Sequence, residues 1–138
     1  KINDQMAINT ANRIVKKMKS HNINIKNSKI LILGLSFKEN CPDIRNTKII
    51  DLYNEFLIYG AKVHCYDPWV SADAAHNEYG INLINSPKPG FYDVVILAVA
   101  HSQFYEEGFD YINTLGKEGY LFCDLKCLFP KEKSDLRL

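Results

Sequence analysis

The stretch Lys29-Ile-Leu-Ile-Leu-Gly34 is a short apolar run that ends in glycine. A strand with one solvated face alternates apolar and polar side chains, whereas this run has no polar residue between its lysine and its glycine. The pattern therefore predicts a strand that is buried on both faces. Further strands are expected over residues 61–67, where a partly alternating run stops before Pro68, and over the apolar runs 92–100 and 119–124.

Helical spacing of apolar residues fills the intervals between the expected strands. One helix is expected to begin at Asn46 or Thr47, both competent N-caps, and to end at Gly60. Residues 71–79 and 102–115 carry shorter helical stretches. Ahead of the first strand, an amphipathic helix is predicted from apolar residues at helical spacing, namely Met6, Ala7, Ala11, Ile14, Val15 and Met18.

Strands that alternate with helices, each strand nearly all apolar, indicate the α/β class. The predicted fold is a doubly wound, mostly parallel, Rossmann-like sheet preceded by an N-terminal helix. The expected boundaries are a lead-in helix over residues 1–22 and an α/β domain over residues 23–138. Within that domain a weaker pattern predicts an additional strand over residues 81–84. Residues 22–28 are expected to be a polar linker and residues 131–138 a polar tail.

Length, composition and charge limit what the chain can do. A chain of 138 residues with 46% hydrophobic and 12% aromatic residues fits one folded domain. The formal net charge of +1 gives no overall field that would hold nucleic acid or an anionic membrane, so an anionic ligand must be held by local charges. No membrane span or secretory signal is recognised, which predicts a cytoplasmic protein. Because the chain starts with Lys1 rather than Met, we expect it to be a piece of a longer protein.

The four cysteines are expected to be free thiols. Cys41, Cys65, Cys123 and Cys127 include no C-x-x-C pair and have no histidine at ligand spacing, so neither a zinc site nor a disulfide scaffold is predicted. Cys65 and Cys123 fall inside expected strands, where they are interpreted as small buried apolar residues.

The segment that follows the first strand, Gly34-Leu-Ser-Phe-Lys-Glu-Asn-Cys-Pro-Asp-Ile-Arg45, lies where doubly wound sheets bind ligands. It lacks the G-x-G-x-x-G pattern that lets bare backbone approach a pyrophosphate. It instead carries Lys38 and Arg45 on either side of a proline-containing turn, ahead of a helix N-terminus, which together form an anion site without glycines. Asp43 is expected to hold Arg45 in a bidentate pair. The spacing of these residues alone does not distinguish an anion-binding site from a set of solvated loop charges.

Four segments of the chain, in order, resemble the signature of the UDP-glucose/GDP-mannose dehydrogenase family in its C-terminal UDP-binding domain. These segments are Gly34-Leu-Ser-Phe-Lys38, Asp43-Ile-Arg-Asn-Thr47, Tyr59-Gly-Ala-Lys-Val63 and Tyr66-Asp-Pro68. Ile2-Asn-Asp4 is similar to the start of the helix that leads into that domain, and Asp124-Leu-Lys126 to its last ligand-contacting turn. The form of residues 38–43 most resembles the branch that acts on UDP-N-acetylhexosamines for bacterial surface polysaccharides.

The resemblance implies an NAD-dependent UDP-sugar 6-dehydrogenase, which oxidises the sugar C6 hydroxyl to a carboxylate in two steps through a cysteine-bound thioester, using two NAD+. The family's dinucleotide fingerprint and nucleophilic cysteine lie in regions N-terminal to this domain, so no catalytic residue is predicted here. The resemblance implies that Phe37 and Lys38 contact the UDP-sugar and that Arg45 reaches the NAD. Lys126 is also a predicted substrate contact, although many members have arginine there, which would replace a bidentate clamp with a point charge. The implied partners are the N-terminal NAD-binding domain and, in full length, further copies in a homo-oligomer.

Three other residues carry two interpretations each. Cys41 lies in a cationic loop near a helix N-terminus, which would suit a second nucleophile, but no base is evident beside it and the family's nucleophile comes from another segment. His101, at the end of a strand, is either a substrate contact or a turn residue ahead of a Ser102 cap. Asp67 is either a ribose ligand or a structural residue.

Two functions of different class follow from the sequence. The first is the substrate-binding part of a dehydrogenase, and the alternative is a free-standing nucleotide-binding or regulatory α/β module without catalysis. An independent dinucleotide-binding oxidoreductase is disfavoured because the loop after the first strand has one glycine, Gly34. An upstream G-x-G-x-x-G and a nucleophilic cysteine in the open reading frame would separate the first from the second.

Overall fold

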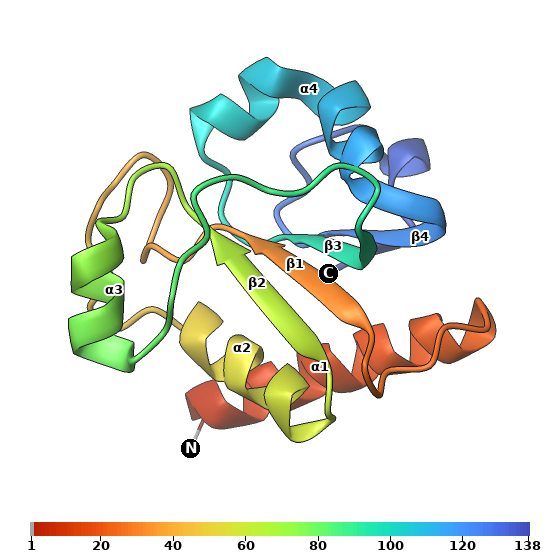
Figure 1. Ribbon diagram of the computed structural model, residues 1–138, viewed down its shortest axis with the longest axis horizontal. Coiled ribbons are helices and arrows are strands. Elements are labelled where there is room, and N and C mark those ends of the chain that lie inside the picture. Colours follow the sequence, from red (N-terminus) through yellow and green to blue (C-terminus); the bar gives the residue numbers. More distant parts are fainter. Residues whose placement is uncertain (1) are drawn as a thin grey trace.

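The computed structural model describes residues 2–138, with side chains from residue 5 onward; Lys1, the first residue of the predicted lead-in helix, lies outside them. Figure 1 shows helices and strands alternating along the chain after an N-terminal helix. The helices are α1 (Ile2–Ser20), α2 (Ile49–Ile58), α3 (Ala72–Tyr79) and α4 (Ser102–Leu115), and a short 3-10 turn, η1, spans Lys131–Lys133. The strands are β1 (Lys29–Leu33), β2 (Lys62–Tyr66), β3 (Tyr92–Leu97), β4 (Gly116–Asp124) and β5 (Leu136–Arg137).

The five strands form one parallel sheet in the order β2-β1-β3-β4-β5. From β1 the chain moves outward to β2 and then returns to the other side of β1 to form β3. This reversal creates a topological switch point between the carboxyl ends of β1 and β3, where doubly wound sheets bind ligands. The predicted fold class, a doubly wound parallel sheet preceded by a helix, is confirmed.

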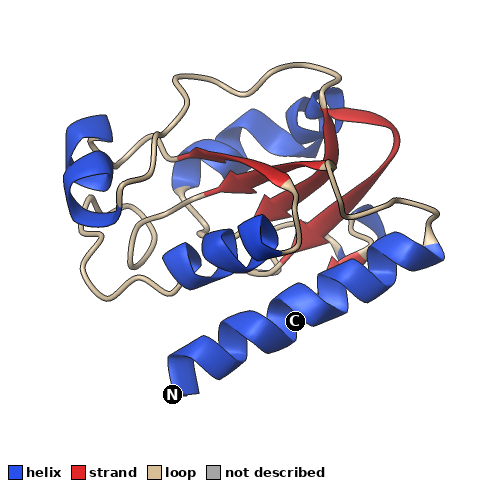
Figure 2. Ribbon diagram, turned by 60° about the horizontal axis from the view of Figure 1, so that its bottom comes forward, coloured by secondary structure: helices blue, strands red, loops and turns tan. Residues whose placement is uncertain are grey.

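Helices cover both faces of the sheet, which explains why its central strands β1 and β3 are almost entirely apolar. Ile30 and Ile32 of β1 pack into the core beneath α1 and α2, whereas Leu31 and Leu33 point into a second core beneath α4. Figure 2 shows α1 and α2 together on one face of the sheet and α4 on the other. All four of these strand residues are at most 1% exposed. The interpretation of residues 29–34 as a strand buried on both faces is therefore confirmed.

The predicted apolar face of α1 is confirmed with one exception. Ala7, Ala11, Ile14, Val15 and Met18 are buried, but Met6 is 54% exposed. No described helix has the length and apolar character needed to cross a membrane. Among the described residues, no three His, Cys, Asp or Glu side chains gather where they could hold a metal ion.

The predicted end of α2 at Gly60 is confirmed, since the helix stops just before this glycine, which has a φ of +89°. At the helix N-termini, α3 has a side-chain cap, whereas α2 and α4 depart from the predicted caps. Ser71 caps α3, since its hydroxyl accepts the Ala74 N–H at 3.2 Å. For α2 the capping residue is Lys48, while the Thr47 hydroxyl accepts the Ile49 N–H at 3.2 Å. The prediction of a Ser102 cap was wrong: His101 occupies the cap position of α4, and the Ser102 N–H donates to the side chain of Asn40 instead.

Two predictions about the sheet edges were also wrong. Residues 81–84 form no strand; a single bond from the Ile84 N–H to the Cys65 carbonyl at 3.0 Å connects them to β2. Residues 131–138 are not a polar tail, because they form η1 and β5. Leu136 pairs with Cys123 of β4 and is 9% exposed, and the Asp135 carboxylate accepts the Phe122 N–H at 2.8 Å. The edge of β4 is covered by a strand of two residues, too short to show a pattern in the sequence.

Candidate functional site

The candidate site is built on the loop that follows β1, at the switch point of the sheet. Gly34 begins this loop with a φ of +107°, and its N–H donates to the Tyr66 carbonyl at 2.8 Å. A Cβ at this position would lie 2.5 Å from the Cβ of Val99, so a side chain cannot be accommodated. The single glycine therefore serves the tight turn and the contact with the segment after β3, and does not form a bare-backbone phosphate loop.

A buried carboxylate and a buried imidazole hold the start of this loop. Asp67 accepts hydrogen bonds from the N–H groups of Leu35 at 2.7 Å, Ser36 at 3.0 Å and Trp69 at 2.8 Å. Nε2 of His101 lies 3.0 Å from the same carboxylate, and both side chains are fully buried. Burial opposes ionisation of Asp67, but the hydrogen bonds from His101 and the backbone outweigh it and lower the pKa of the carboxyl. The polar atoms of both side chains are occupied inside the fold, so neither side chain is placed to contact a ligand directly.

Arg45 forms the expected pair with Asp43. Its Nε lies 3.0 Å from Oδ1 and its Nη2 lies 3.0 Å from Oδ2, and the Arg45 N–H also donates to Oδ1 at 2.9 Å. The hydrogen bonds from Arg45 lower the pKa of Asp43. The Arg45 side chain remains 80% exposed, so the pair fixes the direction of the guanidinium without burying it. The predicted bidentate pair is confirmed.

A cleft of about 280 Å³ lies between this loop, the N-terminus of α2 and the segments after β3 and β4. Phe37, Lys38 and Lys126 line it together, although Lys126 is 88 residues from Lys38 in the sequence. Lys48, at the N-terminus of α2, adds a third ammonium group that the sequence interpretation did not single out. Arg45 is not among the lining residues. Three of the four predicted site residues are thus brought together and the fourth is not.

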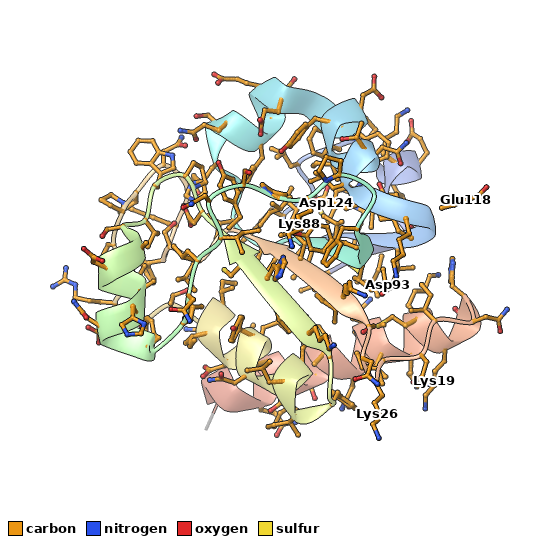
Figure 3. The ribbon with its side chains drawn as sticks, viewed as in Figure 1. Lys19, Lys26, Lys88, Asp93, Glu118 and Asp124 are labelled. Atoms are coloured by element: carbon orange, nitrogen blue, oxygen red, sulfur yellow. The ribbon has the colours of Figure 1, made fainter. Side chains whose placement is uncertain are left out.

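The turn that carries Lys126 is held from inside the protein. Asp124 is fully buried at the end of β4, and its carboxylate accepts the N–H groups of Leu128 at 3.1 Å and Phe129 at 2.9 Å. Figure 3 shows the labelled Asp124 within the fold, whereas Lys19 and Glu118 extend outward at the periphery. Asp124 therefore fixes the backbone of the turn while Lys126 stays free to face the cleft.

An apolar hollow of about 180 Å³ adjoins the cleft and shares Lys48 and Lys126 with it. The rest of its lining comes from α1, from α2 and from the residues that follow β4 and β5. It includes Met6, Leu52, Leu125 and Leu138. The cleft and the hollow together offer a cationic part and an apolar part, as a nucleotide requires.

Larger hollows lie elsewhere on the described surface. One, of about 420 Å³, is lined by the amino end of β4 and by η1, and another, of about 510 Å³, by the basic end of α1 and by β5. A third, of about 360 Å³, lies between the carboxyl end of β2 and residues 83–85. None of the three is lined by the carboxyl ends of β1 and β3, between which this topology binds ligands. We therefore assign the candidate site to the smaller cleft at the switch point.

Comparison with known proteins identifies the family. Residues 31–131 match the model described as "UDP-glucose/GDP-mannose dehydrogenase family, UDP binding domain". The chain belongs to this family. It is 46% identical over 138 residues to the UDP-N-acetyl-D-glucosamine 6-dehydrogenase of Pseudomonas aeruginosa, and 44% identical over the same length to that of Salmonella typhi. Both matches cover all of this chain but only 33% and 32% of the relatives, so the chain spans about a third of their length.

Solved structures of dehydrogenases share the fold. The NDP-N-acetyl-D-galactosaminuronic acid dehydrogenase of Methanosarcina mazei Go1 superimposes with a TM-score of 0.80 at 21% identity, covering 94% of this chain and 27% of that one. The UDP-D-ManNAc dehydrogenase of Pyrococcus horikoshii gives a TM-score of 0.74 at 18% identity, covering 92% and 28%. At these identities the likeness supports the fold alone.

The residues present fit a nucleotide diphosphate better than they fit NAD. Lys38, Lys48 and Lys126 can neutralise a diphosphate beside a helix N-terminus. For NAD, the end of β1 offers no glycine-rich loop, and the one glycine there is closed off by Val99. The carboxyl end of β1 therefore does not form a glycine-rich dinucleotide site.

Proposed function

We propose that this chain is the UDP-sugar-binding domain of an NAD-dependent UDP-sugar 6-dehydrogenase, which oxidises the sugar C6 hydroxyl to a carboxylate for surface polysaccharide biosynthesis. The proposal rests on one observation: Phe37, Lys38 and Lys126 line the same cleft at the switch point of the sheet. These residues come from two distant segments, and the match to a UDP binding domain supports UDP as the ligand of the cleft.

In the proposed complex the diphosphate of the UDP-sugar lies among the ammonium groups of Lys38, Lys48 and Lys126. Phe37 is 56% exposed at the cleft, and an exposed ring beside cationic groups offers an apolar contact surface to the ligand. We propose a UDP-N-acetylhexosamine as the sugar nucleotide, a choice supported by the names of the Pseudomonas aeruginosa and Salmonella typhi relatives. Assay of the full-length gene product with a panel of UDP-sugars and NAD+ tests this choice.

The chain's part in the reaction is binding and orientation. NAD+ accepts the hydride. In our proposal it is bound by an N-terminal domain of the same enzyme. Arg45 lies outside the cleft with an exposed guanidinium that Asp43 holds in place, and we propose that it reaches from this domain toward the NAD. A homo-oligomer of the full-length enzyme is part of the same proposal. If the open reading frame had no upstream G-x-G-x-x-G, the alternative of a free-standing nucleotide-binding or regulatory module would replace it.

The 138-residue chain alone should not reduce NAD+ with any UDP-sugar. It lacks the cofactor fingerprint, and Cys41 has no basic side chain bonded to it within residues 5–138. NADH formation followed by absorbance checks this, with the full-length gene product as the positive control. Steady NADH production by the purified chain that is abolished by Cys41→Ser would show that the chain carries its own nucleophile.

We propose a cytoplasmic location, for which the thiols provide a test. All four cysteines are free, so four thiols should titrate in denaturant without reductant. In the folded chain only Cys41 and Cys127 should react quickly with a thiol reagent, because Cys65 and Cys123 are buried and burial raises their pKa. Fewer than four thiols in freshly purified, unreduced protein would argue against the cytoplasm.

A further inference from the structure

His101 connects three segments that meet beneath the candidate site. Its side chain is fully buried at the end of the segment after β3, with Nε2 at 3.0 Å from Asp67 Oδ2 and 3.2 Å from Ser36 Oγ. On the other side of the ring, Nδ1 accepts the N–H of Asn40 at 2.9 Å. The rings of Trp69 and Phe104 lie 6.2 Å and 5.6 Å away and shield the imidazole from water.

The partners of the two ring nitrogens determine where the proton is. A backbone N–H can only donate, so Nδ1 opposite Asn40 must present a lone pair. The ring proton is therefore on Nε2, where it faces the Asp67 carboxylate. In this tautomer one side of the ring is anchored to the sheet through Asp67, and the other side is an acceptor for the loop.

The two loop residues that touch His101, Ser36 and Asn40, enclose the residues proposed to bind the ligand. Phe37 and Lys38 lie between them, and within residues 5–138 no hydrogen bond or ion pair holds the Lys38 ammonium. Its position thus depends on the backbone. That backbone is held by a bond from the Ser36 hydroxyl to the Lys38 carbonyl at 2.8 Å and by one from the Phe37 N–H to the Asp43 carbonyl at 2.7 Å. At Asn40 the backbone N–H bonds to His101, and the side-chain oxygen accepts the Ser102 N–H at 2.9 Å.

We propose that His101 is a positioning residue that holds the loop from residue 36 to residue 40 so that Phe37 and Lys38 face the UDP-sugar. The inference rests on the proposed function. It assigns the two nitrogens different tasks: Nε2 joins the imidazole to Asp67 and the sheet, and Nδ1 holds the loop through Asn40.

Two substitutions separate these tasks. In His101→Gln the side-chain amide N–H can replace Nε2–H toward Asp67, but no acceptor remains for the Asn40 N–H. In His101→Asn the amide oxygen can replace Nδ1 toward Asn40, but the donor to Asp67 is lost. In the full-length gene product we expect His101→Gln to raise the KM for UDP-sugar about fivefold with kcat little changed, the size expected for one lost buried hydrogen bond. His101→Asn should change KM by less than about twofold while lowering stability more.

A purely structural residue would give the opposite order, because KM would then follow the loss of stability. The control is His76→Gln, which changes an exposed histidine of α3 and should leave KM unchanged. A second measurement does not depend on activity: amide hydrogen exchange of the peptide that spans residues 36–41 should be faster in His101→Gln and unchanged in His101→Asn.

The outcomes distinguish this inference from the function on which it rests. If Lys38→Ala raises the KM for UDP-sugar but the two His101 variants give equal KM values and equal exchange rates, the positioning role is overturned and the proposed function stands. If Lys38→Ala leaves that KM unchanged, the proposed function is overturned, and amide exchange still decides whether His101 holds the loop.

Discussion

Replacement of Asp67 by alanine should lower the free energy of unfolding by about 3–5 kcal/mol, the range expected when one partner of a buried, hydrogen-bonded pair is removed. The substitution leaves the N–H groups of Leu35, Ser36 and Trp69 and the Nε2–H of His101 without their acceptor. Urea unfolding followed by circular dichroism measures the change. The control is Asp110→Asn, which alters an exposed carboxylate of α4 and should change stability by less than about 0.5 kcal/mol. A loss below about 1 kcal/mol for Asp67→Ala would mean that water replaces the carboxylate.

The same carboxylate should make stability depend on pH in a defined direction. The pKa of Asp67 in the folded protein is below its ordinary value of 3.8, so the ionised form stabilises the fold. This contribution is fully present at neutral pH, begins to fall as the pH drops toward 3.8, and is lost as the pH falls through the folded pKa. The stability difference between the wild type and Asp67→Asn should therefore be largest near pH 7 and should shrink below about pH 4. A difference that stays constant over this range would show that Asp67 is not ionised in the fold.

Most of the sheet could be predicted from the sequence because its central strands are buried on both faces. A strand such as β1 must be apolar along its whole length, and that requirement is visible without neighbours. The end of the sheet could not be predicted in this way. β5 has two residues, and it exists because β4 offers unpaired backbone groups and the Asp135 carboxylate reaches Phe122.

The candidate site was predictable in its members but not in its geometry. The resemblance pointed to Phe37, Lys38, Arg45 and Lys126, and the fold brings three of them to one cleft. Arg45 lies outside the cleft because its guanidinium is turned toward Asp43. The spacing of residues in the sequence does not determine that direction. Lys48 was missed even though its place at a predicted helix N-terminus was a usable signal.

The contacts of His101 could not be predicted from the sequence, for a different reason. Whether a histidine after a strand touches a ligand or the protein depends on the donors around it, and here Asn40 comes from a segment 61 residues away. The positive φ of Asn40, +55°, turns its N–H toward the ring. The sequence does not reveal such a backbone conformation, except that asparagine adopts it more readily than most residues.

Lys38→Ala should raise the KM for UDP-sugar about 10-fold or more in the full-length gene product, because it leaves a desolvated anionic group without one of its partners. The KM for NAD+ should change less. Lys38→Arg, which keeps the charge, should restore most of the affinity. The matched control is Lys26→Ala, which removes an exposed lysine that Figure 3 shows pointing away from the protein. That control should change neither KM.

Arg45→Ala should give the reverse order, with the KM for NAD+ rising first and the KM for UDP-sugar second. The first effect follows from the proposed contact of the exposed guanidinium with the cofactor, and the second from the loss of the two bonds to Asp43 that hold the loop. Arg45→Lys keeps the charge but cannot form the bidentate pair, so it should fall between the wild type and Arg45→Ala on both measures. Changes under about twofold in all of these variants would mean that the loop charges are merely solvated, since exposed charges contribute little. A reversed order for Lys38 and Arg45 would mean that Arg45 binds the sugar nucleotide and Lys38 the cofactor.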